Sequence, residues 1–471
     1  MNQVCIIGKT HLIDIVNPNP NILDTVSKII SSRTGEDKDD AFFCCNLGDI
    51  VKKYQQFAAN LSEVQPYYAL KCNSDPVVLR LLTGLGAKFA CASKAEIRKA
   101  LDLGVGADSI LFSNPCKQKT HLKYAAQSGV TLMTFDSINE LNKIKSTHSS
   151  ARLILCTKLQ MLQDDSQPNL TVGCDPDEAV RILERAKELD LQVMGISFSL
   201  DADTVNVASY PHAISMAHEI QRQATELGFK IELLNLGNGF ACTDTDELSF
   251  DEVSHSISVS LQKHFPEGSG IQVIAEPGRY LVTSALTIAV NVIAKRVVHQ
   301  DRDSDFEDDL DDDMSQDKEP AFMYYVNDGV YGSFNCMMYD GALSLTPTPL
   351  DDRSGDQYYS CSIWGPTCDG LDCLTTYQLL PELEVGDWVL YANMGAYTLT
   401  ASSAFNGMPQ PKVNYIISVD LLPILYLDRP RHNLSTPNAV RDPRQVARRC
   451  ESEDIHVTLV RELNFPFNLE R

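Results

Sequence analysis

The sequence lacks the segments and spacings that mark membrane, secreted and zinc-binding proteins. No apolar run is long enough to span a bilayer, and the first ten residues do not join a basic region to an apolar core. We therefore expect no membrane partner and no secretory signal. Fourteen cysteines are present without a CxxC pair or a His/Cys cluster at metal spacing. This pattern predicts reduced thiols, no metal site and a cytoplasmic location.

Positive charge is also scarce. The 40 lysines and arginines are outnumbered by 63 acidic residues, which leaves a net charge of −23. A surface of this sign repels phosphates, so we exclude nucleic acid and an anionic membrane surface as partners. The 471 residues predict two or three domains, and 44% of them are hydrophobic, which is enough for their cores.

Apolar strands alternate with amphipathic helices through the first part of the chain. Eight strands are predicted, at 66–71, 89–93, 110–114, 132–136, 153–156, 193–200, 231–237 and 271–277. The segments between them carry apolar residues at helical spacing, as in Ala179, Ile182, Leu183 and Ala186. This alternation implies parallel strand pairing, and eight units close a barrel. We predict an α/β fold with a (β/α)₈ barrel over residues 41–282.

The remaining segments follow other patterns. After Pro277 the alternation stops, and β-branched segments separated by turns predict a C-terminal antiparallel β domain over residues 283–425. Residues 301–319 contain eleven acidic and two basic residues. We interpret them as a solvated, disordered loop, with an acidic docking site as the alternative. Residues 1–40 are predicted to pack with the β domain, and residues 426–471 to form an arginine-rich tail with little fixed structure.

Chemically useful residues follow three of the predicted barrel strands. Lys71 ends the first strand, at the end where barrels place their chemistry. The seventh strand leads into Gly237-Asn238-Gly239, and the eighth into Glu276-Pro277-Gly278-Arg279. Glycine amides and a guanidinium can cradle a phosphate, and a carboxylate can pair with a protonated ring nitrogen. Together these residues predict a pyridoxal phosphate site. The alternative for Lys71 is an ordinary solvated lysine.

Six segments between residues 40 and 420 form a recognisable set. They are Tyr68-Ala69-Leu70-Lys71-Cys72-Asn73, Asn114-Pro115-Cys116-Lys117-Gln118, Ala275-Glu276-Pro277-Gly278-Arg279-Tyr280, 324–334, 364–372 and Asn393-Met394-Gly395-Ala396-Tyr397. Together they resemble the ornithine decarboxylase and antizyme inhibitor family of polyamine metabolism. This family comprises fold type III pyridoxal-phosphate decarboxylases and inactive relatives, so the resemblance implies an alanine-racemase-type barrel followed by a β domain.

The resemblance implies roles for residues around the cofactor. Lys71 would bond covalently to pyridoxal phosphate, and Glu276 would hold the ring nitrogen. Arg279 and Tyr397 would contact the phosphate. The glycines implied in the same cofactor site are Gly237, Gly239 and Gly278.

Further implied roles concern the substrate and the oligomer. Cys368 would protonate the reacting carbon across a dimer interface, and Asp340 and Asp369 would hold the far amine of the substrate. A site formed between two subunits requires a homodimer. In the active enzyme a lysine pairs across that interface with the aspartate that corresponds to Asp372, and here the lysine position is Thr171. We therefore expect Asp372 to lack this partner and the dimer to be weak.

Several residues depart from the pattern of the active enzyme, and all belong to the cofactor site. Ala90 replaces an aspartate, and Cys156 replaces an arginine. Ser199 replaces a histidine that stacks on the ring, Asp201-Ala202 replaces Gly-Ser beside the phosphate, and Asn238 replaces a glycine. Each lost charge-assisted hydrogen bond costs about 1.5–3 kcal/mol, so we predict weak or absent cofactor binding.

Two functions follow from the resemblance. The first is a pseudoenzyme that binds antizyme and spares ornithine decarboxylase. The stretch that resembles the antizyme-binding element carries Lys117, Lys123 and Lys143, although an ordinary barrel surface remains the alternative for it. The second is an active decarboxylase that converts ornithine to putrescine or acts on another amino acid. The retained residues Lys71, Cys368, Asp369 and Asp340 favour it.

Overall fold

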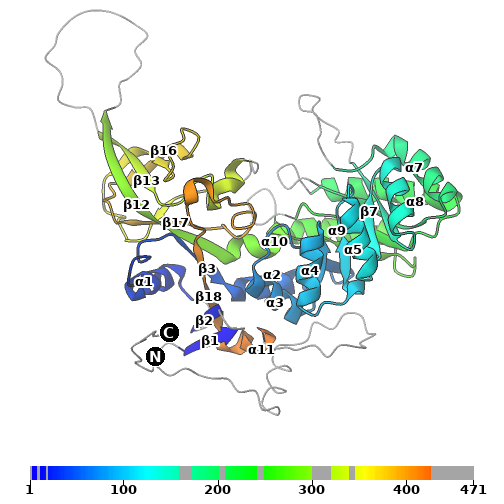
Figure 1. Cartoon of the computed structure of the whole chain (residues 1–471), viewed down its shortest axis with the longest axis horizontal. Helices are drawn as coiled ribbons and strands as arrows, with labels where there is room; N and C mark the ends of the chain where they lie inside the picture. The colour runs from blue at the N-terminus through cyan, green and yellow to red at the C-terminus, as the bar shows by residue number, and fades with distance from the viewer. Residues whose placement is uncertain are drawn as a thin grey trace, which may run out of the picture. The chain divides into compact units, whose positions relative to one another are not determined.

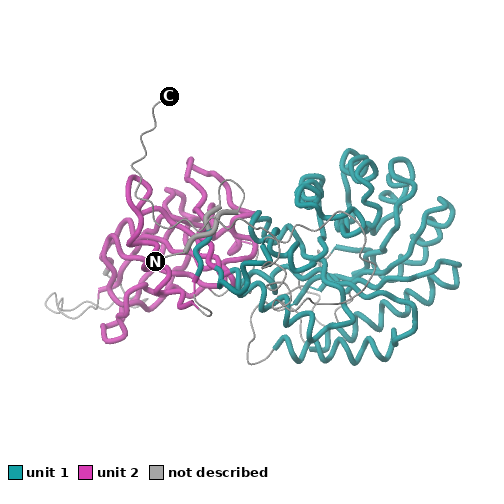
Figure 2. The backbone as a smooth tube through the Cα atoms, turned by 90° about the horizontal axis from the view of Figure 1, so that it is seen from below, with its two compact units in different colours: residues 1–15, 47–284, 417–471 teal, residues 16–46, 285–416 magenta. Residues whose placement is uncertain are grey.

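The computed structural model describes residues 3–7, 11–16, 20–158, 172–200, 207–240, 249–299, 320–338 and 345–425. The described chain divides into two compact units (Figure 2). Unit 1 is built around residues 47–284, and unit 2 around residues 16–46 and 285–416. The predicted acidic loop and arginine-rich tail lie outside the described residues. So do Thr171, Asp201, Ala202 and Asp340.

Unit 1 contains a closed barrel of eight parallel strands, which confirms the predicted fold class. Every predicted barrel strand is present, and most end one or two residues earlier than predicted. Around the barrel the order is β10-β11-β4-β5-β6-β7-β8-β9. The strands are β4 (Val64–Ala69), β5 (Lys88–Cys91), β6 (Ile110–Phe112), β7 (Leu132–Phe135), β8 (Arg152–Thr157), β9 (Gln192–Phe198), β10 (Leu233–Asn235) and β11 (Gln272–Ala275).

The barrel interior is a packed core. One side chain from each strand enters a single buried cluster, made of Tyr67, Ala90, Leu111, Leu132, Ile154, Met194, Leu233 and Ile274. Apolar side chains fill this layer, so the barrel is not a pore and its chemistry must lie at the strand ends. The cluster includes Ala90, at the position where the resemblance implies an aspartate.

Helices of unit 1 alternate with the strands and surround the barrel (Figure 1). Local signals set their ends. For example, Asp75 caps the helix that follows Lys71 by accepting from the amides of Val77 and Val78. The helices are α2 (Leu47–Asn60), α3 (Pro76–Leu85), α4 (Lys94–Asp102), α5 (Lys119–Gln127), α6 (Ile138–Thr147), α7 (Pro176–Glu188), α8 (Ser209–Glu226), α9 (Phe250–His264), α10 (Arg279–Val282) and α11 (Leu422–Leu425).

Unit 2 is a β domain in which most neighbouring strands are antiparallel. The strand order is β18-β3-β12-β13-β15-β16, and β17 pairs with β12 and β14. Two pairs, β3–β18 and β13–β15, are parallel. The strands are β3 (Phe42–Asn46), β12 (Leu286–His299), β13 (Pro320–Val326), β14 (Thr348–Pro349), β15 (Tyr358–Trp364), β16 (Cys373–Pro381), β17 (Trp388–Tyr391) and β18 (Lys412–Ser418).

Of the N-terminal part of the chain, residues 16–46 belong to unit 2, whereas the described residues up to Ile15 belong to unit 1. Helix α1 (Ile22–Ser32) buries Val26 and Ile29 in a core that also contains Phe42 and Ile416. The short strands β1 (Gln3–Ile7) and β2 (His11–Val16) pair antiparallel. Among the described residues, no helix has both the length and the apolar character that a membrane crossing requires.

Candidate functional site

Lys71 lies in the turn that follows β4, at the carboxyl end of the barrel. Its side chain is exposed, and the Tyr68 hydroxyl stabilises the turn by donating to the carbonyl of Asn73 at 2.8 Å. The turn packs against the segment after β11, where a Cβ at Gly278 would lie only 3.0 Å from the Cβ of Cys72. Glycine at position 278 therefore lets the two loops meet. The structure brings Lys71 and the Glu276–Arg279 segment to one mouth of the barrel.

Glu276 is buried at this mouth and belongs to a polar network that links β10 and β11. The side-chain amide of Asn235 donates to Glu276 Oε1 at 2.7 Å, and the Gly237 amide donates to Asn235 Oδ1 at 3.0 Å. The Glu276 amide donates in turn to the Gly237 carbonyl at 2.7 Å. Sequence reasoning missed Asn235, although a polar residue inside the apolar run Leu233–Leu236 is a signal for such a role.

Two thiols near Glu276 are held in the neutral form. Burial, followed by the charge of Glu276, raises the pKa of Cys156 to about 12. Burial also raises the pKa of the Cys91 thiol well above its usual value. Neither thiol therefore contributes a positive charge beside Glu276.

The loop after β10 makes bonds that the sequence does not predict. Ser199, just beyond β9, donates to Asn238 Oδ1 at 2.5 Å, and the Tyr210 hydroxyl donates to the Asn238 carbonyl at 3.2 Å. Gly237 has φ +65°, and a Cβ there would lie 2.0 Å from the carbonyl oxygen of Phe198. This glycine is therefore required by close packing against β9, whether or not a phosphate is bound.

The mouth contains residues that the resemblance implies for both the ring and the phosphate of pyridoxal phosphate. Near the implied ring nitrogen, a buried carboxylate held by Asn235 and an exposed Lys71 are present. In the loop implied for the phosphate, the Gly237 amide donates to Asn235, and Asn238 accepts from Ser199, which stands at the position implied for ring stacking. Gly239 lies beyond them in the same loop, and Arg279 begins α10.

Unit 2 contains the other described residues that are predicted for catalysis, substrate binding or cofactor binding, namely Cys368, Asp369 and Tyr397. Cys368 is exposed. Asp369 accepts from the Leu371 amide and from the Tyr331 hydroxyl, both at 2.9 Å, and these bonds lower the pKa of its carboxyl group. Tyr397 has φ +56°, a left-handed conformation that is strained for a bulky residue and common at ligand sites. Sequence reasoning did not identify Tyr331 as the partner of Asp369.

Asp372 accepts hydrogen bonds within its own chain, and the expectation that it lacks a lysine partner across a dimer interface stays a prediction. Its side chain is fully buried. One oxygen accepts from the Val330 amide at 2.9 Å, and the other accepts from the amide and the hydroxyl of Thr367 at 3.0 and 2.6 Å. A carboxylate bound in this way stabilises the loops of unit 2 without a residue from a second subunit.

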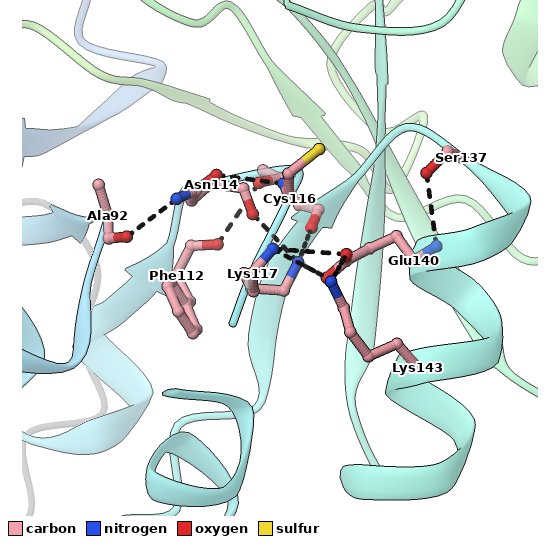
Figure 3. Close-up of polar contacts among 9 residues, drawn as sticks. Ala92, Phe112, Asn114, Cys116, Lys117, Ser137, Glu140 and Lys143 are labelled. Carbon is pink, nitrogen blue, oxygen red and sulfur yellow. Dashed lines mark hydrogen bonds and ion pairs between the residues drawn. The ribbon is translucent and has the colours of Figure 1, made fainter. Parts of the chain in front are cut away.

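The predicted antizyme-binding lysines differ strongly in exposure. Lys123 is exposed on α5, whereas Lys117 is 2% exposed. The Lys117 ammonium lies 3.0 Å from Glu140 Oε1 and donates to the Thr134 carbonyl at 2.6 Å (Figure 3). On the other side of Glu140, Lys143 Nζ lies 2.5 Å from Oε2. Lys143 is partly exposed, so Glu140 connects a buried cation with a surface cation.

Comparisons with known proteins agree with this architecture. The family model for the pyridoxal-binding domain of pyridoxal-dependent decarboxylases matches residues 47–283. Ornithine decarboxylase of Mus musculus is 42% identical over 413 residues, 87% of each chain. Antizyme inhibitor 2 of Xenopus laevis is 44% identical over 395 residues, 83% of this chain and 84% of its own. The crystal structure of the Paramecium bursaria Chlorella virus arginine decarboxylase superposes with a TM-score of 0.75 at 30% identity, covering 84% of this chain and all of that one.

Proposed function

The chain belongs to the pyridoxal-dependent decarboxylase family that includes ornithine decarboxylases and antizyme inhibitors, and we propose that it is a regulator that binds antizyme and so spares ornithine decarboxylase. In this proposal the protein acts in polyamine metabolism, and its own cofactor binding is impaired. It is cytoplasmic and forms at most a weak homodimer. The chain is about as similar to an ornithine decarboxylase as to an antizyme inhibitor, so overall identity does not separate the two functions. The evidence for one of them must come from the site residues.

The single observation that carries the proposal is the hydrogen bond from Ser199 to Asn238. Ser199 stands where the resemblance implies a ring-stacking histidine, and Asn238 stands where it implies a glycine beside the phosphate. In place of a ring that stacks on the cofactor and a glycine that leaves room for its phosphate, the chain has two side chains that bond to each other. Loss of the arginine at Cys156 and of the aspartate at Ala90 weakens the surroundings of the ring as well.

The surface formed by α5 and α6 supports antizyme as the proposed binding partner. Lys123 and Lys143 offer cations to a protein with an acidic face, and Lys143 is held in place by Glu140. Lys117 acts on this surface indirectly. Its buried ammonium holds the opposite oxygen of Glu140, so it is a positioning residue and not a contact. We therefore expect antizyme to contact Lys123 and Lys143 directly.

An active decarboxylase is the second candidate, and a specific observation favours it. Lys71 is exposed at the barrel mouth beside the Glu276 segment, and Asp369 is kept ionised by its bonds to Leu371 and Tyr331. A protein that only binds antizyme has no need of these groups. In this alternative the chain decarboxylates ornithine or another amino acid, with Cys368 as the proton donor and Asp340 and Asp369 as amine ligands.

A binding titration tests the proposal. Labelled antizyme is titrated with the purified full chain and, in parallel, with Lys71→Ala. We expect a complex with micromolar or tighter affinity that Lys71→Ala leaves unchanged, because the α5–α6 surface does not include Lys71. Absence of binding at micromolar concentration would contradict the proposal, and a complex that forms only with the intact lysine would favour the enzyme.

A further inference from the structure

Unit 2 contains two buried carboxylates that lie beside the turn after β13. Asp328 is 6% exposed, and Asp372 is completely buried. The Gly329 amide donates to Asp328 Oδ1 at 2.8 Å. The amide of the next residue, Val330, donates to Asp372 Oδ1 at 2.9 Å. Because consecutive amides of one turn bind the two side chains, both negative charges of this buried acid pair lie in one small region of the fold.

The backbone around the buried acid pair leaves room for the carboxylates only because it contains glycine. A Cβ at Gly329 would lie 2.1 Å from Asp372 Oδ1, and one at Gly365 would lie 2.2 Å from the same oxygen. A Cβ at Gly332 would lie 2.0 Å from Asp328 Oδ1. Glycine at these positions lets two loops close around the acids. The pair is thus part of the packing of unit 2 and not an incidental group of surface acids.

The charge of the buried acid pair is not balanced by a basic side chain of the described residues. Burial, followed by the charge of Asp372, raises the pKa of Asp328 to about 6, although hydrogen bonds from Ser333 and Gly329 oppose the rise. The carboxyl group is therefore largely ionised at neutral pH. Buried charges in proteins are normally paired with an opposite charge or bound to an ion. The pair therefore favours a positively charged guest.

A small cavity adjoins the buried acid pair and has room for one guest. Its volume is about 20 Å³, which is enough for one molecule of the size of water. Asp328 Oδ2 is buried and makes no hydrogen bond within the described residues, and the same holds for the hydroxyl of the neighbouring Ser333. The free oxygen of Asp328 is therefore available to a guest. Besides the two acids, the lining side chains that carry oxygen are Asn327, Tyr331, Thr367, Ser402, Ser403 and Gln410.

We propose that this cavity binds one small monovalent cation, of the size of potassium or ammonium, held by Asp328 Oδ2 and by the charge of Asp372. Divalent ions fit less well. Calcium takes about six to eight oxygen ligands and magnesium needs a near-ideal octahedron, whereas the buried acid pair supplies few charged oxygens. Among the described residues, no three His, Cys, Asp or Glu side chains gather as a site for such ions. A single positive charge balances Asp328 in its ionised form.

The cation stabilises two loops that carry candidate site residues. Tyr331 belongs to the turn that contains Asp328, and its hydroxyl donates to Asp369 Oδ2 at 2.9 Å. Asp369 lies in the loop that contains Asp372. The ring of Tyr331 lies 4.5 Å from that of Phe405, and both residues line the cavity. Binding of the cation therefore fixes the loop of Asp369, whether the chain binds antizyme or decarboxylates an amino acid.

Thermal unfolding of the full chain tests the site. Melting temperatures are compared at neutral pH in the chlorides of potassium, ammonium and tetramethylammonium at equal ionic strength, so that charge screening is the same. Tetramethylammonium is too large for a cavity of about 20 Å³ and serves as the reference. We expect potassium and ammonium each to raise the melting temperature by about 2–4 °C, with a dependence on salt concentration that saturates. No rise with either ion overturns the proposal.

A pair of variants assigns the effect to the cavity. Asp328→Asn removes the charged oxygen that holds the cation, so it should melt at the same temperature in all three salts. The control Asp351→Asn removes an exposed carboxylate of unit 2 and should keep the full difference between the salts. A difference that persists in Asp328→Asn, or one that is lost equally in the control, overturns the proposal.

Thallium(I), a heavy ion of potassium size, locates the site directly. Crystals of the full chain soaked in thallium(I) nitrate should show a strong anomalous peak beside Asp328 Oδ2, and crystals of Asp328→Asn should show none. A water molecule without anomalous signal at this position overturns the proposal. So does a melting temperature that follows protein concentration and not the choice of cation, because the balancing charge then comes from a second copy of the chain.

Discussion

The ammonium of Lys117 lies 3.0 Å from Glu140 Oε1, and both side chains are almost completely buried. Lys117 also donates to the carbonyls of Asn114 and Thr134, and its own amide donates to Glu140 (Figure 3). Ser137 caps α6 by accepting from the Glu140 amide, which fixes the start of the helix that carries the carboxylate. A buried ion pair thus joins the segment between β6 and α5 to α6.

Glu140→Gln should destabilise the barrel strongly. The change leaves the Lys117 cation buried without its counter-charge, at a cost of about 3–5 kcal/mol. Unfolding of the full chain in urea measures the loss. Lys117→Met combined with Glu140→Gln is the matched control, because it removes the stranded cation as well. If the double variant is as unstable as Glu140→Gln alone, the pair is not the source of the effect.

Lys123→Glu combined with Lys143→Gln should weaken antizyme binding about tenfold, since each exposed cation contributes up to about 1 kcal/mol to a charged contact. Glutamine is chosen at position 143 because a second carboxylate beside buried Glu140 would disturb the fold. The control Lys52→Glu with Lys263→Glu makes charge changes at exposed positions on α2 and α9. An equal loss in the control would mean that net charge, and not the α5–α6 surface, governs the binding.

The purified chain should show little of the visible absorbance that pyridoxal phosphate gains when it bonds to a lysine. The reason is the loss of the stacking ring at Ser199 and of the glycine at Asn238, together with the loss of charged groups at Ala90 and Cys156. Spectra are recorded after dialysis against excess cofactor. A full band that disappears in Lys71→Ala would refute the impaired-cofactor account and favour the active decarboxylase.

Asp328 and Asp372 should respond in opposite ways to replacement by asparagine. Burial raises the pKa of Asp328 to about 6, although its Oδ1 accepts from the amides of Gly329 and Ser333. Between about pH 4 and pH 6 the folded chain keeps a proton that the unfolded chain releases, so this residue makes the fold less stable as pH rises through that window. Asp328→Asn keeps both bonds to Oδ1 and removes the dependence, gaining about 3 kcal/mol at pH 7.

Asp372→Asn is the contrasting case. Both oxygens of Asp372 accept hydrogen bonds, so an amide nitrogen in place of one of them would face a donor and cost about 1–3 kcal/mol. Thermal unfolding of both variants at pH 4.5 and pH 7 measures the difference. Loss of stability in Asp328→Asn at pH 7 would show that its carboxylate is needed in the charged form.

The sequence predicts the strands well because each barrel strand is buried on both faces and is therefore a continuous apolar run. The same rule counts every buried apolar residue of a run as part of the strand, so it predicts strand ends that lie too late in the sequence. Leu70 is apolar and fully buried, but it lies in the turn after β4, where its amide donates to the carbonyl of Ala90. Burial alone does not separate a strand residue from a buried turn residue.

The bonds that define the candidate site are beyond sequence reasoning because they join distant segments. Asn235 and Glu276 are 41 positions apart, and Ser199 and Asn238 are 39 apart. Lys117 is predicted to bind antizyme from the resemblance of its stretch, and its burial depends on a carboxylate 23 positions away, which the sequence does not reveal. The resemblance also gives Asp372 its interface role, whereas its bonds to Thr367 and Val330 form only when the loops fold together.

The central claim is that the chain regulates ornithine decarboxylase through antizyme and does not itself decarboxylate ornithine. The most direct measurement adds the purified chain, in increasing amounts, to ornithine decarboxylase that has been inhibited by antizyme, and follows release of carbon dioxide from ornithine. The account predicts that activity returns in proportion to the added chain, and that the chain alone releases none. If activity does not return, or if the chain alone decarboxylates ornithine, the account is contradicted.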